Sequence, residues 1–254
     1  IEKIGAWRQA ERQGAPVGPL AGEGAASGPF VAPSIRSARR TALVMGNGAY
    51  RFIAPLRNPV NDARAVSRTL NQCGFDVDTV VEADRRDMLL AMRRFHDELK
   101  ETPGGVGLFF YAGHGIQMDG ENYLVPVNAR VEKQFEVDLE CYKMSALLAA
   151  MEESGTDINI VILDACRNNP FPRSFRSATR GLARMKTVGS GMLIAYATGP
   201  GAVALDGEGR NGIYTRHLLE AIATPGLSIE QVFKSVRQKV MAETNNSQTP
   251  WEEA

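Results

Sequence analysis

Hydrophobic positions along the chain alternate between short strand-like runs and longer stretches with helical spacing. Short runs rich in aliphatic and aromatic residues are typical of strands in a buried sheet, and they cover residues 40–46, 75–81, 106–112, 158–163 and 192–197. Between them, apolar residues recur three or four positions apart, which predicts helices over residues 59–73, 84–100, 144–151, 211–223 and 228–243. This alternation predicts an α/β fold with a mainly parallel sheet.

Local signals mark where several elements begin and end. Asn58 followed by Pro59 is typical of a helix N-cap with proline at the first helical position. Asp119-Gly120, between two apolar runs, predicts a β-hairpin turn. We expect a final edge strand close to Trp251, near the end of the chain.

Residues 1–38 differ in composition from the rest of the chain. Residues 14–29 are dense in Gly, Ala and Pro, and such a segment cannot bury enough side chain to form a core. We interpret residues 1–38 as a linker or pro-segment, with a short helix over residues 1–13. Residues 39–254 then form the folded domain. The chain starts without Met, which is consistent with a fragment, so the targeting of its precursor is left open.

The composition is that of an ordinary globular protein. The 254 residues are 44% hydrophobic and 23% charged, and the formal net charge is zero. This balance argues against a nucleic-acid or acidic-membrane partner, and no apolar run has membrane-spanning length. Cys73, Cys141 and Cys166 are isolated from one another, so neither a zinc site nor a disulfide framework is expected. Free thiols favour a reducing compartment such as the cytoplasm.

Two of the predicted strands end in residues with catalytic chemistry. Run 158–163 breaks into polar sequence just before Cys166, and run 106–112 is followed by a Gly-His-Gly motif at His114. Chemistry gathers at the carboxyl ends of strands in open α/β sheets, so neighbouring strands would bring a thiol and an imidazole together, as a cysteine nucleophile requires. The amides of Gly115 and Cys166 would form an oxyanion hole. The alternative is a histidine with only a structural role.

The two motifs resemble those of a known peptidase family. Tyr111-Ala-Gly-His-Gly115 and Asp164-Ala-Cys-Arg-Asn168, with the histidine roughly 50 residues upstream of the cysteine, are similar to motifs of the caspase-like (clan CD, peptidase C14) cysteine peptidases. The resemblance covers residues 40–254. Asp164 and Asn168 stand where caspases carry Gln and Gly, and they resemble the bacterial metacaspase-like or orthocaspase branch. The resemblance implies a caspase-like three-layer sandwich, with a mainly parallel sheet of about six strands and helices on both faces.

The resemblance also implies acyl transfer by a Cys–His dyad. His114 would activate the Cys166 thiol for attack on the scissile carbonyl. The amides of Gly115 and Cys166 would stabilise the oxyanion, and water would release the acyl-enzyme. The sequence offers no obvious third member, and the family generally manages with a dyad. No cofactor is expected.

Two acidic residues indicate the substrate preference. Caspases cleave after Asp and line that pocket with basic groups, whereas Asp164 stands two residues before the cysteine. Asp62, early in the first predicted helix, matches a second acidic position of metacaspase-like proteins. Two carboxylates would bind Arg bidentately or Lys as a point charge, which predicts cleavage after Arg or Lys. The alternatives are an exposed helix-dipole role for Asp62, a strand-end cap at Asp164, and acidic specificity if Arg57 faces the pocket.

The basic stretch after the cysteine predicts self-processing. In caspase-like proteins an intersubunit region, where maturation cuts fall, joins a large-subunit part to a small-subunit part. Here the large-subunit part would end near residue 170, the small-subunit part would begin near residue 190, and residues 168–189 would lie between them. The alternative is a solvated or anion-binding loop. The candidate cleavage sites are Arg173, Arg176, Arg180 and Arg184, with Arg36, Arg39 and Arg40 as a second region that would release the N-terminal segment.

The sequence assigns no metal to the chain. Asp206 and Glu208 lie in the Gly-rich segment 199–212 and could bind calcium, which some metacaspases need. EF-hand spacing is absent, and a loop with glycines for turns explains the segment equally well, so calcium stays open. The expected partner is a polypeptide with a basic residue before the scissile bond. A monomer is expected, because metacaspase-like proteins are usually monomers.

Three competing interpretations concern function. Gly46-Asn47-Gly48 resembles part of a dinucleotide-binding loop but lacks its third glycine and a clear ribose-binding acid. A caspase-fold regulatory or scaffold module with little or no protease activity is the main alternative, and the presence of both Cys166 and His114 favours an enzyme over it. A zymogen, held inactive by its N-terminal segment, is the third.

Overall fold

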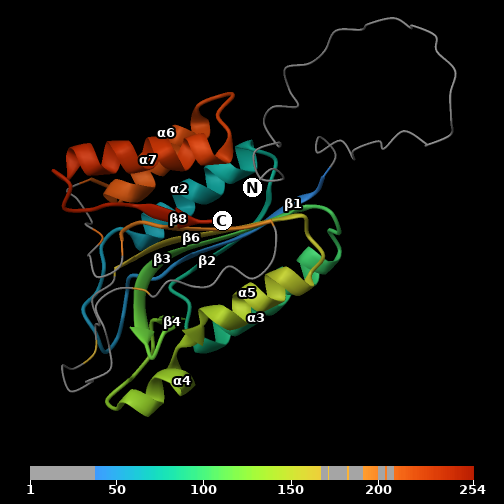
Figure 1. The fold of residues 1–254 in the computed structure, drawn as a ribbon. Coiled ribbons are helices and arrows are strands. Elements are labelled where there is room, and N and C mark those ends of the chain that lie inside the picture. Colours follow the sequence, from blue (N-terminus) through green and yellow to red (C-terminus); the bar gives the residue numbers. More distant parts are fainter. Residues whose placement is uncertain (1–37, 167–170, 172–181, 183–190, 200–203, 205–208) are drawn as a thin grey trace, which may run out of the picture.

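The computed structural model describes residues 38–166, 171, 182, 191–199, 204 and 209–254. Within this part of the chain, a central sheet has the strand order β2-β1-β3-β6-β7-β8 (Figure 1). Neighbouring strands run parallel from β2 to β7, and β8 pairs antiparallel with β7 at one edge. The strands are β1 (Arg40–Gly46), β2 (Asp76–Val81), β3 (Val106–Met118), β6 (Ile158–Cys166), β7 (Met192–Tyr196) and β8 (Trp251–Glu253).

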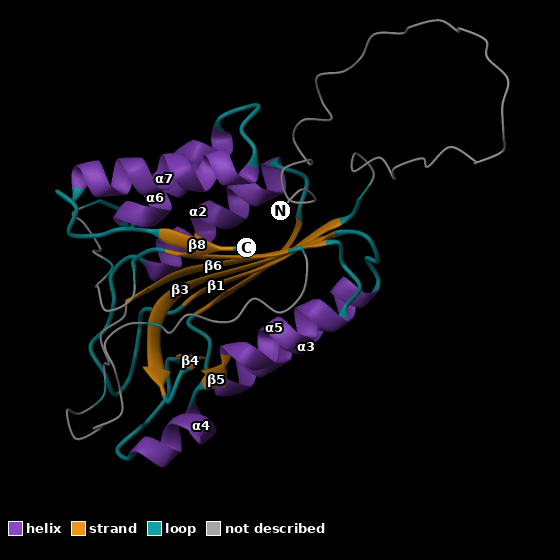
Figure 2. Cartoon of the chain, viewed as in Figure 1, coloured by secondary structure: helices purple, strands orange, loops and turns teal. Residues whose placement is uncertain are grey.

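Helices cover both faces of the sheet (Figure 2). On one face, α2 (Pro59–Gln72), α6 (Ile213–Ala223) and α7 (Ile229–Glu243) share a core with alternate residues of the central strands. On the other face pack α3 (Arg85–Lys100) and α5 (Met144–Glu153). The chain therefore forms the α/β fold that the sequence pattern predicted, as the three-layer sandwich that the family resemblance implied.

The central strands alternate their side chains between the two cores, as buried parallel strands do. In β3, Leu108 and Phe110 belong to the core under α2, α6 and α7, and Phe109 and Tyr111 belong to the core under α3 and α5. Each of the four is at most 4% exposed. Burial of such a side chain contributes roughly 1.5–3 kcal/mol, which explains why these runs carry a strong strand signal in the sequence.

Beyond the central sheet, β3 continues into a small antiparallel extension. Asp119 and Gly120, with φ angles of 52° and 84°, turn the chain into β4 (Glu121–Leu124), so the predicted hairpin is confirmed. A further short strand pairs with β4. Three elements here were not predicted, because they are too short to show a period: η2 (Gln134–Glu136), α4 (Val137–Glu140) and β5 (Tyr142–Lys143).

Two predicted strand ends are wrong. The apolar runs end at Ala112 and Leu163, but β3 continues to Met118 and β6 continues to Cys166. The pairing outlasts the apolar runs because backbone groups bond across the strands whatever the polarity of the side chains. His114 is therefore a strand residue and Cys166 is the last residue of its strand, although the apolar pattern predicted that both lie just past the strand ends.

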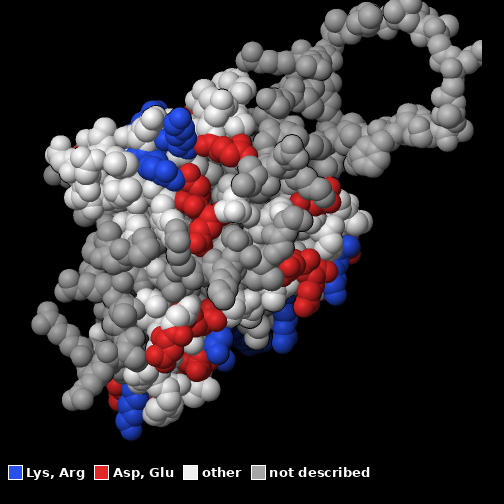
Figure 3. All heavy atoms as spheres, in the orientation of Figure 1, with Lys and Arg blue, Asp and Glu red and all other residues white. Residues whose placement is uncertain are grey.

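Charges of both signs occur side by side on the face drawn in Figure 3, where acidic side chains lie between the basic ones. This mixture is consistent with the formal net charge of zero. Among the helices of the described residues, none is both long enough and apolar enough to cross a membrane.

Candidate active site

The sheet brings the two candidate catalytic residues together. In the parallel ladder between β3 and β6, Ala112 pairs with Asp164 and His114 pairs with Cys166. This pairing confirms the expectation that the two strands are neighbours. Paired positions on neighbouring strands lie about 5 Å apart. Gly115, the candidate oxyanion donor, is the next residue of β3. The side chain of Cys166 lies outside the described part of the structure.

The imidazole of His114 is held by a backbone carbonyl. The residue is 7% exposed, and its Nε2 lies 2.8 Å from the carbonyl oxygen of Ala54. A carbonyl only accepts hydrogen bonds, so Nε2 carries a proton, and in the neutral imidazole Nδ1 is then the nitrogen with the lone pair. The sequence itself shows no obvious third member for the dyad. A backbone carbonyl leaves no signal in residue types, so only the fold reveals Ala54.

Two buried tyrosines fix the peptide of His114. Tyr50 Oη accepts a hydrogen bond from the His114 amide at 2.7 Å, and the centroid of its ring lies 4.6 Å from that of the imidazole. Tyr111 Oη lies 3.3 Å from Tyr50 Oη, 3.0 Å from the carbonyl oxygen of His114 and 3.1 Å from that of Val125. Burial raises the pKa of both phenols, so both keep their proton as a hydrogen-bond donor. The two hydroxyls therefore hold the amide on one side of His114 and the carbonyl on the other.

Gly113 leaves room for the two tyrosines. Its φ angle is 156°, and a Cβ placed on it would lie 2.7 Å from the hydroxyl oxygens of both Tyr50 and Tyr111. Packed interiors do not accommodate contacts this short without displacing a neighbour. Position 113 must therefore lack a side chain if the tyrosines are to reach the peptide of His114.

Segment 47–56, which supplies the carbonyl and one of the tyrosines, is tied to neighbouring strand ends. The side chain of Asn47 is fully buried, accepts a hydrogen bond from one backbone amide and donates to two backbone carbonyls. The Glu82 carboxylate accepts from the amides of Gly48 and Ala49 at 3.0 and 2.8 Å. These amides, which a phosphate would need, are occupied by a carboxylate, and this argues against the dinucleotide-loop interpretation.

The two acidic residues of the predicted pocket lie beside the first turn of α6. Asp62, in the first turn of α2, is 2% exposed, and its Oδ1 accepts from Asn211 Nδ2 at 2.8 Å and from the Gly212 amide at 3.1 Å. Asp164, half-buried in β6, accepts from Thr215 Oγ1 at 2.6 Å. A Cβ placed on Gly212 would lie 3.3 Å from one oxygen of Asp62 and 3.4 Å from one oxygen of Asp164. The fold therefore brings both carboxylates to one point.

Burial bears on the alternatives for these residues. An acid that serves only the helix dipole would be exposed, and Asp62 is buried, so that interpretation is wrong. Arg57, which would favour acidic specificity if it faced the pocket, is exposed. Asp164 lies two residues before the end of β6 and accepts a hydrogen bond from Thr215 of α6, and the strand-end cap stays an open alternative.

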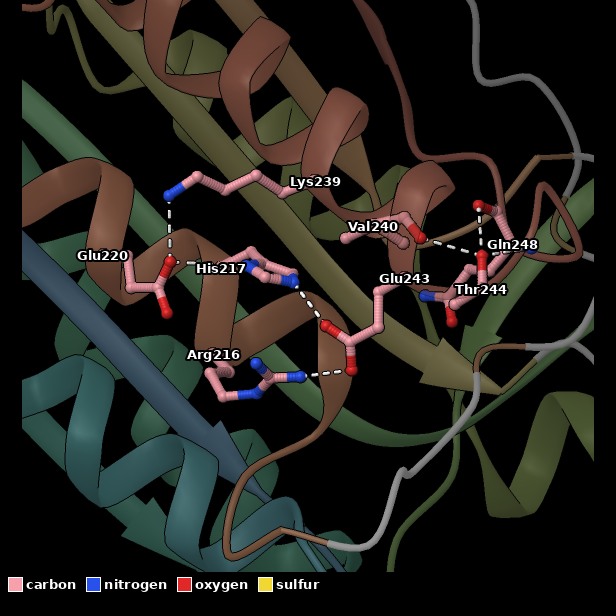
Figure 4. A network of polar contacts seen from close by, with 8 residues as sticks. All are labelled: Arg216, His217, Glu220, Lys239, Val240, Glu243, Thr244 and Gln248. Carbon is pink, nitrogen blue, oxygen red and sulfur yellow. Dashed lines mark hydrogen bonds and ion pairs between the residues drawn. The ribbon is translucent and has the colours of Figure 1, made fainter.

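Charged side chains anchor α6 to α7 (Figure 4). His217 Nε2 lies 2.7 Å from Glu243, and His217 Nδ1 lies 3.4 Å from Glu220. Arg216 also pairs with Glu243, and Lys239 of α7 pairs with Glu220 at 2.9 Å. The first turn of α6 and the two residues before it contact both acids, and these contacts with α7, about one turn further along α6, therefore hold the helix in place.

Comparison with known proteins decides the family. The family profile described as caspase domain (peptidase C14) matches residues 39–254. The chain belongs to the caspase domain family. This is the family of the caspase-like cysteine peptidases.

Curated relatives and a solved structure agree with the assignment. Mucosa-associated lymphoid tissue lymphoma translocation protein 1 of Homo sapiens is 29% identical over 186 residues, which are 72% of this chain and 22% of the human protein. Its Mus musculus homologue is 28% identical over 186 residues, which are 72% of this chain and 21% of the mouse protein. The match thus spans about a fifth of these relatives. The crystal structure of protein GSU0716 from Geobacter sulfurreducens shares the fold, with a TM-score of 0.63 at 15% identity, over 85% of this chain and 92% of that chain.

The other predicted residues of this caspase domain are distributed as follows. Arg39 is exposed and pairs with Asp76 at 3.7 Å, and Arg40 donates to the carbonyl of Cys73 at 2.6 Å. Where the structure describes the chain, it contains no group of three or more His, Cys, Asp or Glu side chains that could hold a metal ion. The remaining candidates lie outside the described residues: Arg36, Arg173, Arg176, Arg180, Arg184, Asp206 and Glu208.

Proposed function

We propose that this caspase domain is a cysteine endopeptidase that cleaves after Arg or Lys, with Cys166 as the nucleophile and His114 as the general base. One observation carries the proposal: the strand register pairs His114 with Cys166, and the same strand carries Asp164 two residues earlier, beside Asp62. Directly paired positions of a sheet carry their side chains on the same face. The register therefore supports a thiol and an imidazole within reach of each other.

The role of each group follows from its environment. Because the Ala54 carbonyl holds Nε2 of His114, Nδ1 is the atom that accepts the thiol proton of Cys166. The thiolate attacks the scissile carbonyl carbon, and the oxyanion accepts hydrogen bonds from the amides of Gly115 and Cys166. As the C–N bond breaks, Nδ1 gives the proton to the leaving amine. The same imidazole then takes a proton from water, which hydrolyses the thioester and restores the thiol.

The acid pair supports a basic residue before the scissile bond. Asp62 and Asp164 both approach Gly212, and this closeness supports a pocket that offers two carboxylates. A guanidinium binds carboxylates through two parallel hydrogen bonds, and an ammonium binds them as a point charge. Asp164 and Asn168, which replace the caspase Gln and Gly, are the basis on which we propose the metacaspase-like branch of the family, and Asp62 is a further match to it.

Self-processing belongs to the same proposal. An enzyme that cleaves after Arg would cut the basic stretch between residues 168 and 189, which carries Arg173, Arg176, Arg180 and Arg184. Intact-mass spectra test this step, because fragments ending at these arginines should form in the wild type and not in Cys166→Ala. We assign no metal and a monomeric state to this activity.

The proposal is tested with matched fluorogenic peptides that differ only in their last residue, which is Arg, Lys or Asp. The cleavage of each peptide is measured with and without calcium. We expect cleavage after Arg and Lys, and a loss of more than about 10⁴-fold in Cys166→Ala, because the nucleophile is removed. The control is Cys73→Ala, which removes a cysteine that forms no disulfide and should leave the rate unchanged. Cleavage after Asp would contradict the acidic pocket, and activity that survives in Cys166→Ala would contradict the nucleophile.

A further inference from the structure

We infer that the first turn of α6 and the two residues before it set a preference of the pocket for Arg over Lys, with Thr215 and Asn211 as the residues that position the two carboxylates. The inference rests on the proposed acidic pocket and adds the element that orients it. Its basis is a set of hydrogen bonds through which α6 and the two residues before it hold Asp62 of α2 and Asp164 of β6.

Thr215 fixes the direction of Asp164. Its hydroxyl donates to Asp164 Oδ2 at 2.6 Å, a short distance of the kind expected when the acceptor is charged. Thr215 is fully buried, and a β-branched side chain in a helix has few χ1 conformations. The donor therefore has few positions open to it, and the hydrogen bond orients the carboxylate of Asp164.

Asp62 is fixed by the residues just before the helix. Gly212, the N-cap of α6, directs its amide at both oxygens of Asp62, at 3.1 and 3.3 Å, and Asn211 adds its side-chain amide at 2.8 Å. The amides of a helix N-terminus favour negative charge. Any side chain at position 212 would begin within 3.4 Å of both acids. The chain thus approaches the two carboxylates as closely as a glycine allows.

Two carboxylates with fixed directions favour Arg. A guanidinium is planar and presents its donors in a rigid fork, so it gains most when the acceptors are held in matching positions. An ammonium is a compact charge on a flexible stem and tolerates many acceptor directions. Releasing one carboxylate should therefore weaken Arg binding more than Lys binding. The orientation also depends on the docking of α6, which His217 ties to α7 (Figure 4).

The test is to measure peptide affinities by calorimetry with the Cys166→Ala protein, which cannot cleave the peptides. The two peptides are identical except that one ends in Arg and the other in Lys. We expect Arg to bind more tightly than Lys. Adding Thr215→Val, which keeps the shape and removes the donor, should weaken Arg binding about tenfold, as for loss of a hydrogen bond to a charged group. Lys binding should change about threefold or less, so the preference shrinks. Thr215→Ser keeps the hydroxyl and should keep the preference.

Each outcome decides a separate point. If the Cys166→Ala protein binds neither basic peptide, the acidic pocket is contradicted and the inference falls with it. If both bind and Thr215→Val leaves their affinity ratio unchanged, the pocket stands and the role of Thr215 is overturned. Should Thr215→Val fail to fold, Asn211→Ala decides instead, because Asn211 is only half-buried. A several-fold loss of Arg preference in Asn211→Ala supports the inference, and an unchanged ratio overturns it.

Discussion

At the scale of single residues, the catalytic proposal depends on how firmly His114 is held. The Ala54 carbonyl fixes which imidazole nitrogen carries the proton, and Tyr50 contacts both the amide and the ring of the same residue. Tyr111 then fixes the carbonyl side of the peptide. A general base needs a fixed direction more than strong basicity, because the proton transfer requires a short, aligned contact.

Tyr50→Phe tests this positioning. The variant keeps the ring against the imidazole but removes the acceptor of the buried His114 amide, and an unsatisfied buried donor costs about 1–3 kcal/mol. We expect kcat on the Arg-ending peptide to fall roughly tenfold with KM little changed, since Tyr50 is bonded to His114 and not to either acid. Tyr142→Phe, at a half-buried residue of β5, is the matched control and should keep both constants. A change confined to KM would contradict the role assigned to Tyr50.

At the scale of elements, α6 links the acid pair to the rest of the domain through α7. His217 is 8% exposed and lies between Glu220 of its own helix and Glu243 of α7. The hydrogen bond from His217 is the main cause that lowers the pKa of Glu243, and Arg216 adds to it. A carboxyl whose pKa is lowered in the folded state stabilises the fold above its ordinary value of 4.5 and loses that contribution as pH falls below it.

Glu243→Gln should therefore destabilise the domain at neutral pH and matter less in acid. Because the side chain of Glu243 is 37% exposed, we expect about 0.5 kcal/mol at pH 7. This corresponds to a melting temperature lower by roughly 1–2 °C. The difference from the wild type should shrink between about pH 5 and pH 3 in thermal melts. Glu152→Gln, on the exposed side of α5, should show no such pH-dependent difference. A difference that grows in acid would contradict this account of the α6–α7 contact.

At the scale of the whole molecule, the sequence predicted the parallel sheet and the meeting of the two motifs, and the family resemblance implied the layers, but the contacts that complete the site were not predicted. The apolar runs of β3 and β6 place these strands in a buried sheet, and the paired motifs follow them, so the meeting of His114 and Cys166 was predictable. The Ala54 carbonyl was not, because it lies 60 residues from His114 and a backbone group has no residue signal. The Thr215–Asp164 contact spans 51 residues and needed the docking of α6 to become visible.

The central claim is that Cys166 is the nucleophile of a pocket that accepts Arg, and covalent labelling tests it most directly. The wild-type protein would be incubated with an Arg-ending peptidyl ketone whose leaving group is displaced by a thiolate. The modified cysteine would then be identified by mass spectrometry. We predict labelling of Cys166, competition by an Arg-ending peptide, slower labelling in His114→Ala, and little reaction with an Asp-ending reagent. Cys141 should stay unmodified, because burial raises the pKa of its thiol. Equal labelling of Cys73 and Cys166, or equal reaction with the Asp-ending reagent, would contradict the account.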